Sequence, residues 1–199
     1  MTRIFVGLIL NYRINMKQKT AQGFTLIELL IVIAVLGILA VAVLSAINPI
    51  EQINRSRDTG SRSDAEQLLG AIDRFYATAG YYPWVSGADI KIISTAWGEV
   101  DNVVWTDGAT PVMTKLSEAG TGELKASFTN RITANGYNTL FKWNRGTQGD
   151  STYVCFLPKS DSFLTEAGNR CGTTTPGDYP AEACPANCAV DKTCFSCLP

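Results

Sequence analysis

The fold is decided by the stretch Gly23–Pro49, GFTLIELLIVIAVLGILAVAVLSAINP, which is apolar almost throughout. From Leu29 to Ile47 it has nineteen residues without a charge. A helix rising about 1.5 Å per residue would cover about 30 Å over this length, the thickness of one hydrocarbon core. The segment 29–47 is therefore predicted to be a transmembrane helix. One residue does not fit a plain anchor, because Glu28 places a carboxylate at its start.

Basic residues gather before this segment. Upstream of Gly23 the chain carries no acidic residue and four basic ones: Arg3, Arg13, Lys17 and Lys19. Because cytoplasmic flanks of membrane helices collect Lys and Arg, the amino end is predicted to lie inside and everything after Ile47 outside. No other apolar run approaches spanning length, so a single pass through the membrane is predicted.

Composition narrows the possible functions. The 199 residues include 17 Lys and Arg against 18 Asp and Glu, so net charge does not favour nucleic acid as the main ligand. The chain has no His, which excludes His-based triads, His-ligated metals and imidazole acid–base chemistry. No glycine motif for cradling phosphate is recognisable either. We expect no enzyme, no catalytic residue, no cofactor and no metal.

Three interpretations of the amino end compete. In a plain membrane anchor, the side chain of Glu28 would reach back to the lipid headgroups and would have no further function. An ordinary secretory signal would be cut after a small residue such as Ala42 or Ala46, but its apolar core spans only about 7–15 residues. Third, the segment resembles the type IV pilin family, whose members share the pattern Gly-Phe-Thr-Leu-Ile-Glu before about twenty apolar residues. Residues 23–28 match that pattern at every position.

The resemblance implies a role for Glu28. In the family, a prepilin peptidase cuts after the glycine and methylates the new amino group, which here implies cleavage between Gly23 and Phe24 and N-methylation of Phe24. The leader 1–23 would be removed, and translation from Met16 would shorten it to MKQKTAQG. A carboxylate in hydrocarbon costs about 2–3 kcal/mol on insertion scales, so it usually has a partner. The amine of Phe24 in an incoming subunit can meet Glu28 of an assembled one, which makes both residues candidates for an assembly signal.

The function implied is that of a structural subunit of a type IV pilus. Such subunits are held by membrane lipid as single-pass proteins of the cytoplasmic membrane until the pilus assembly machinery polymerises them into a homopolymeric surface filament, or fimbrium. One alternative is a pseudopilin of a type II secretion system, in a periplasmic pseudopilus, or a minor pilin at the tip. An alternative of another class is a membrane-anchored binding domain that never polymerises.

A long helix over 24–79 is predicted, with a kink at Asn48–Pro49 because proline removes an N–H and crowds the previous turn. Apolar residues recur beyond Pro49 at three- and four-residue spacing, which indicates one buried face: Ile50, Ile53, Ala65, Leu68, Leu69, Ile72, Phe75 and Tyr76. Gly80 and Pro83 predict that the helix ends at Ala79.

The middle of this predicted helix does not continue the buried face, since the stretch 54–64 offers no apolar residue for burial. A solvated neck, or a break near Gly60, is therefore predicted there. Melting between Gly37 and Pro49 in the assembled state is a further hypothesis from the resemblance. The outer face is predicted to carry acid–base pairs four residues apart: Glu51 with Arg55, Asp58 with Arg62, and Arg62 with Glu66.

The head, 80–199, is predicted to complete an α+β fold in which the long helix packs on an antiparallel sheet. Strands are expected at 139–143 and 151–157, joined by a hairpin turn over 144–150. The irregular connection 84–127 holds a possible strand at 103–106 and a helical turn at 113–119. Four tryptophans could form a stacking platform for sugars or bases, but core or loop-anchoring positions are expected: Trp84, Trp97, Trp105 and Trp143.

The six cysteines all follow the helix, and an even number on the outer side predicts disulfides: Cys155, Cys171, Cys184, Cys188, Cys194 and Cys197. Sequence cannot choose among fifteen possible pairings. Cys155 with Cys171 is preferred, because relatives often tie their carboxyl-terminal loop in this way. The tail 184–197 then holds two disulfides or, with unusual spacing, a four-thiolate zinc site. Asp150 and Asp161 could bind calcium, but no calcium-loop spacing is present and solvated loop acids are expected.

Overall fold

The computed structural model describes residues 23–46, 48–87, 94–101, 103–117, 120–134, 137–147, 149–172 and 175–199. The chain divides into two compact units between Ile47 and Asn48. The leader, including Met16, lies outside the described residues except for Gly23.

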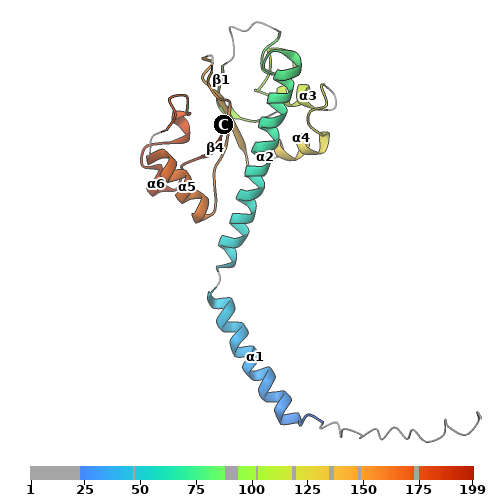
Figure 1. Cartoon of the computed structure of the whole chain (residues 1–199), viewed down its shortest axis with the longest axis vertical. Coiled ribbons are helices and arrows are strands. Elements are labelled where there is room, and N and C mark those ends of the chain that lie inside the picture. Colours follow the sequence, from blue (N-terminus) through green and yellow to red (C-terminus); the bar gives the residue numbers. More distant parts are fainter. Residues whose placement is uncertain are drawn as a thin grey trace, which may run out of the picture. The chain divides into compact units, whose positions relative to one another are not determined.

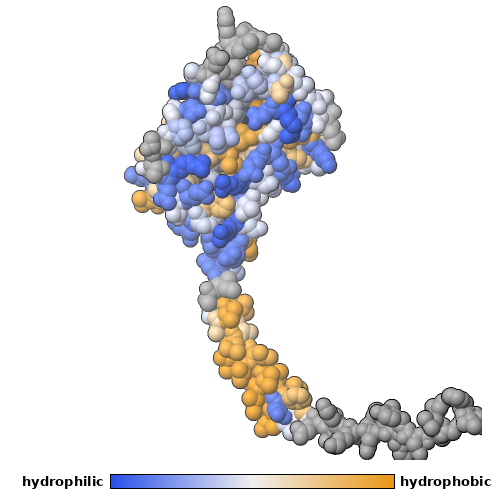
Figure 2. All heavy atoms as spheres, in the orientation of Figure 1, coloured by the Kyte–Doolittle hydropathy of each residue, from blue (hydrophilic) through white to orange (hydrophobic). Residues whose placement is uncertain are grey.

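The first unit is the helix α1, Leu26–Ala46, which runs through Gly37 without interruption. Its segment Leu26–Ser45 is long and apolar enough to cross a membrane, and none of it is buried against other parts of the chain. Figure 2 shows α1 as an almost continuous apolar surface. A helix that is apolar on all sides needs lipid or other chains around it.

The second unit begins with α2, Pro49–Ala79. The side chain of Asn48 accepts hydrogen bonds from the N–H groups of Ile50 and Glu51, and Pro49 occupies the first helical position, where its missing N–H costs nothing. Pro49 therefore starts a second helix rather than kinking one continuous helix. The carboxyl end is as predicted, because Gly80 adopts a left-handed conformation (φ 77°) and its N–H donates to the carbonyl of Tyr76.

The sheet has four strands in the order β1-β2-β3-β4, and each neighbouring pair is antiparallel: β1 Thr95–Glu99, β2 Leu140–Asn144, β3 Tyr153–Phe156 and β4 Ser196–Leu198. The predicted hairpin is confirmed as β2 and β3, with Leu140 opposite Phe156. The strand predicted at 103–106 is wrong. There the carboxylate of Asp101 accepts hydrogen bonds from the N–H groups of Val103, Val104 and Trp105, which folds the segment into a turn.

Short helices complete the head: α3 Val112–Leu116, α4 Ala126–Ile132, α5 Asp161–Gly172, a 3-10 turn at Ala181–Ala183, and α6 Cys188–Asp191. The predicted helical turn near 113 is α3. In Figure 1, α3 and α4 lie near α2 on one side of the sheet, and α5 and α6 lie on the side of the edge strand β4. The result is the predicted α+β architecture.

The main core lies between the second half of α2 and the sheet. Leu68, Ile72 and Phe75 are buried against a cluster that includes Leu140 and Phe156. Two apolar positions at the start of the predicted buried face do not join it, since Ile50 is 68% and Ile53 55% exposed. The prediction of one continuous apolar face is therefore correct only from Ala65 onward, apart from half-exposed Tyr76.

The polar stretch of α2 is not broken, and one of its faces is buried against the head, so the expectation of a break or a fully solvated neck at 54–64 is wrong. α2 passes through Gly60 as a regular helix, and Asp58, Ser61 and Asp64 are buried. Of the three acid–base pairs predicted along the helix, only Arg62 with Glu66 forms among the described residues, at 3.8 Å. Asp58 turns inward and Glu51 binds the N–H groups of Asp161 and Ser162 at the start of α5.

Candidate functional site

The amino end of α1 is closed by reciprocal hydrogen bonds between Thr25 and Glu28. The hydroxyl oxygen of Thr25 accepts from the N–H of Glu28 at 3.3 Å, and the carboxylate of Glu28 accepts from the N–H of Thr25 at 3.3 Å. The Thr25 hydroxyl also donates to that carboxylate at 3.2 Å. This is a capping box, in which two N–H groups left without helical partners are satisfied at once.

The signal for this box was present in the sequence, because Thr25-Leu26-Ile27-Glu28 has the required Thr-x-x-Glu spacing. Interpreting Glu28 only as a partner for another subunit missed it. The carboxylate also lies in the first turn, where the positive end of the helix dipole favours an anion. Glu28 therefore stabilises the start of its own helix.

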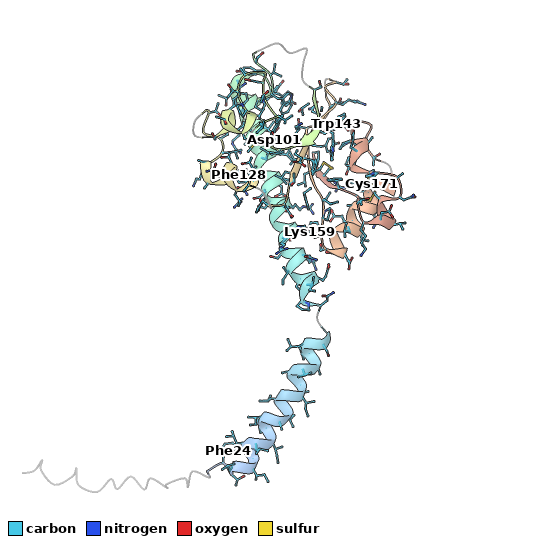
Figure 3. The ribbon with its side chains drawn as sticks, turned by 180° about the vertical axis from the view of Figure 1, so that it is seen from behind. Phe24, Asp101, Phe128, Trp143, Lys159 and Cys171 are labelled. Atoms are coloured by element: carbon cyan, nitrogen blue, oxygen red, sulfur yellow. A yellow bond between two sulfur atoms is a disulfide. The ribbon has the colours of Figure 1, made fainter. Side chains whose placement is uncertain are left out.

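Phe24 and Gly23 lie just before the helix, and both are exposed. Figure 3 labels Phe24 at the beginning of α1, where its side chain is 84% exposed. The N–H that Thr25 donates to Glu28 belongs to the peptide bond between Phe24 and Thr25. A cut between Gly23 and Phe24 would leave that bond, and therefore the capping box, intact.

Beyond Glu28, the helix offers no other charge to a neighbouring molecule. The hydroxyl of Ser45 donates to the carbonyl of Ala42 at 2.9 Å, so this polar group is satisfied inside the helix. The apolar side chains of α1 are exposed around the whole circumference in the single chain. One carboxylate at the first turn of an otherwise apolar cylinder can therefore mark a position along the axis.

The six cysteines form three disulfides: Cys155 with Cys197, Cys171 with Cys184, and Cys188 with Cys194. The preferred pairing of Cys155 with Cys171 is wrong. Cys155 lies on β3 directly opposite Cys197 on β4, with 4.0 Å between their Cα atoms. Cys171 lies near the end of α5, where it meets Cys184. β4 has only three residues, and its pairing with β3 gave no periodic signal in the sequence.

The four-thiolate zinc site considered for the tail does not form. Cys184 and Cys197 pair with cysteines outside the segment 184–197, and Cys188 pairs with Cys194. The Sγ atoms of Cys171, Cys188 and Cys194 lie within 4.8 Å of one another, but each belongs to a disulfide. A zinc site needs thiolates rather than oxidised sulfur.

The two acids considered for calcium are each engaged by a cation. Asp150 accepts two hydrogen bonds from Arg145 and one from the N–H of Thr147, and the bond from Arg145 is the main cause that lowers the pKa of Asp150 to about 2. Asp161 accepts from Lys192 at 2.6 Å. Both carboxylates therefore act in local ion pairs of the head.

The tryptophans mostly serve packing. Trp84 and Trp105 are buried and stack with 6.0 Å between their ring centroids. Trp143 donates its indole N–H to the carbonyl of Asp178. Trp97 is half-buried and stacks on Phe141. These positions fit the core and loop-anchoring interpretation better than a platform for sugars or bases.

Comparison with known proteins adds two matches to this geometry. Residues 18–44 match the family described as the prokaryotic N-terminal methylation motif. The chain is 30% identical over 164 residues to the fimbrial protein EcpC of Eikenella corrodens, and this match covers 81% of the chain and 99% of that protein. No solved structure matches the chain. From the motif, the nearly complete coverage of this relative and the α+β architecture, we conclude that the chain belongs to the type IV pilin family of fimbrial proteins.

Proposed function

We propose that this chain is the structural subunit of a type IV pilus. Prepilin peptidase cuts it between Gly23 and Phe24, and the new amino group of Phe24 is methylated. Before assembly, the subunit is anchored in the cytoplasmic membrane, with its amino end on the cytoplasmic side and its head, 80–199, on the outer side. The pilus assembly machinery then polymerises it into a surface filament through the helical region 24–79.

The observation that carries this proposal is the surface of α1. Its segment Leu26–Ser45 buries nothing within its own chain and can span a bilayer. In lipid, such a surface is covered by acyl chains. When the subunit leaves the membrane the same surface needs a new apolar cover, and equivalent helices of other subunits supply one.

Glu28 sets the axial position in this scheme. The capping box gives its carboxylate hydrogen bonds from Thr25 but no opposite charge. The amine exposed at Phe24 by cleavage is a cation, and an amine from a neighbouring subunit supplies that charge in an apolar setting, where an ion pair is less screened. The two roles are compatible because a carboxylate has about four lone-pair sites and can accept from several donors.

The decisive variant is Glu28→Gln rather than Glu28→Ala. Glutamine keeps the capping box but carries no charge, so it separates docking from helix capping. We expect Glu28→Gln to be inserted and processed while filament yield falls at least about tenfold, since about 1.4 kcal/mol of subunit contact free energy corresponds to that factor. Thr25→Val is the matched control, because it removes the hydroxyl of the box and keeps the carboxylate, and it should assemble better than Glu28→Gln.

The measurements are intact mass with amino-terminal sequencing of sheared surface material, together with filament yield. A wild-type chain that begins with N-methylated Phe24 supports processing and polymerisation. Wild-type filament yield from Glu28→Gln would contradict the docking role alone. A chain that begins at Met1 or Met16 and stays in the membrane would contradict the whole proposal and favour an anchored binding domain.

A pilus is preferred to a secretion pseudopilus because the relative that covers most of the chain is named a fimbrial protein. The same fractionation separates the two, since a pseudopilin or minor subunit would be scarce in sheared surface material. Family membership also indicates a structural protein rather than an enzyme.

A further inference from the structure

A cavity of about 430 Å³ lies between α2 and the segments that precede β2 and follow β3. Two of its described lining residues are charged, Arg57 on α2 and Lys159 after β3, and both are cations. The others are neutral: Ser56, Gly60, Ser61, Tyr137 and Asn138. Figure 3 shows Lys159 beside α2 in the head. Neither cation forms an ion pair with a carboxylate in the described part of the chain.

Two acidic residues of α2 near the cavity form no ion pair with Arg57 or Lys159 in the described part of the chain, because their carboxylates are directed to other groups. Asp58 accepts hydrogen bonds from the N–H groups of Lys159 and Ser160 and from the Ser160 hydroxyl. Asp64 accepts from Arg131 at 2.6 Å and from the Tyr137 hydroxyl at 2.6 Å. Among the described residues, the guanidinium of Arg57 and the ammonium of Lys159 are therefore donors without an acceptor at a shared cavity, and two such cations can bind an anion there.

Two features favour a phosphate on a lipid over other anions. Arginine offers a planar fork that matches phosphate oxygens, and lysine adds a point charge. The site is also close along the chain to the membrane helix, since Arg57 follows Asn48 by nine residues, or about 14 Å of helix, and helical side chains tilt back toward the amino end. Exposed Ile50 and Ile53 lie on the intervening turns of α2, where apolar side chains suit the acyl boundary.

We propose that this cavity binds the phosphate of an anionic phospholipid headgroup and so holds the head at the membrane surface before assembly. The inference rests on the proposed function, because it requires α1 to lie in the same bilayer. On assembly, the subunit would leave the membrane and the cavity would release the lipid.

The test uses the full chain in uncharged dodecyl maltoside micelles, titrated with short-chain dihexanoyl phosphatidylglycerol. The amide signals of Gly60 and Asn138 are followed by NMR, because both residues line the cavity. We expect saturable shifts with phosphatidylglycerol and much weaker ones with zwitterionic dihexanoyl phosphatidylcholine. Arg57→Gln and Lys159→Gln should each weaken binding about tenfold, as loss of one charge-assisted contact implies.

Arg55→Gln is the matched control. Arg55 lies on the same helix, nearer along the chain to the membrane segment, and is exposed like Arg57 and Lys159, but it does not line the cavity. It should weaken binding less than about twofold, the loss expected for a screened surface charge. If Arg55→Gln weakened binding equally, the lipid would be attracted diffusely to basic residues rather than bound at this cavity, and the proposal would be overturned.

Two other outcomes would also overturn it: the absence of saturable binding, or inorganic phosphate that binds as tightly as the lipid. Unchanged amide spectra elsewhere establish that each variant is folded. Failure here is distinguishable from failure of the pilus proposal, because processing at Phe24 and filament yield are measured separately on cells.

Discussion

The two halves of α2 attach to the same head by different forces. From Ala65 to Phe75 the helix buries apolar side chains against the sheet. From Glu51 to Asp64 it has no such face, yet Asp58, Ser61 and Asp64 are as buried as the core. This amino-terminal half is attached to the head by hydrogen bonds to segments about a hundred residues away along the chain, such as the loop at Ser160. A polar stretch of helix is therefore not evidence of a solvated neck.

The reason lies in the loop rather than in the helix. The chain that leaves β3 turns into α5 at Asp161, and its N–H groups at Lys159 and Ser160 have no helical partner there. Buried N–H groups need acceptors, and the carboxylate of Asp58 accepts from both. Glu51 does the same for the next two N–H groups. α2 thus caps α5 with its own side chains.

The largest expected effect tests the apolar half. Ile72→Ala removes a fully buried side chain from the core and should lower the free energy of unfolding by about 3–4 kcal/mol. Ile50→Ala is the control, because the same change at a side chain that is 68% exposed should cost less than about 0.5 kcal/mol. Urea unfolding of the full chain in dodecyl maltoside measures both, and similar losses would contradict the division of α2 into two halves.

The next effect tests the polar half. Asp58→Ala leaves the N–H groups of Lys159 and Ser160 without their acceptor, and Ser160 is fully buried, so we expect a loss of about 2–3 kcal/mol. Asp58→Asn retains one acceptor oxygen and should recover part of that loss. Hydrogen exchange at Ser160 should rise in Asp58→Ala. A loss below about 0.5 kcal/mol would mean that this half is solvated after all.

A smaller effect concerns a cation, Lys115, that packs against the apolar half. Lys115 lies over the ring of Phe75 and binds Asp107 at 3.0 Å. Hydrogen bonding lowers the pKa of Asp107 to about 2, chiefly through the N–H of Thr110 and with help from Lys115. Because the folded-state pKa is depressed, the stabilisation is present above the ordinary pKa of 3.8 and is lost as the pH falls through about 2.

Wild type should therefore lose about 1 kcal/mol more than Asp107→Asn between pH 5 and pH 2, after allowance for solvent screening. Unfolding curves at the two pH values measure the difference. Parallel losses in both proteins would show that Asp107 does not couple to folding.

The smallest effect is a gain. Gly60 lies within α2, and a Cβ built on it meets no atom within 4 Å, so Gly60→Ala should stabilise by about 0.5–1 kcal/mol through helix propensity. At Gly70 a Cβ would approach the Arg74 guanidinium to 3.1 Å, and Arg74 is bonded to Glu123, so Gly70→Ala should gain less. A loss at Gly60 would indicate that another group already fills this space.

Local sequence signals predicted much of the fold but failed where distant segments meet. The α2 terminus at Gly80, the β2–β3 hairpin and the apolar face from Ala65 all follow from short-range patterns. The helix α5 and the strands β1 and β4 were missed, because α5 is mostly polar, β1 lies in the stretch 84–127 that was expected to be irregular, and β4 is very short. The pairing of Cys155 with Cys197 depends on that strand and could not be obtained without it.

The sequence by itself determined the amino-terminal part of this protein. The apolar run, the carboxylate of Glu28 and the Thr-x-x-Glu spacing all act within a few turns of one helix, so adjacent residues contain all the information. Tertiary structure alone decided the disulfide pairing, the burial of Asp58 and Asp64, and the meeting of Arg57 with Lys159 at one cavity. Each of these depends on residues far apart in the chain, and the free energy of such a contact exists only once the sheet has brought them together.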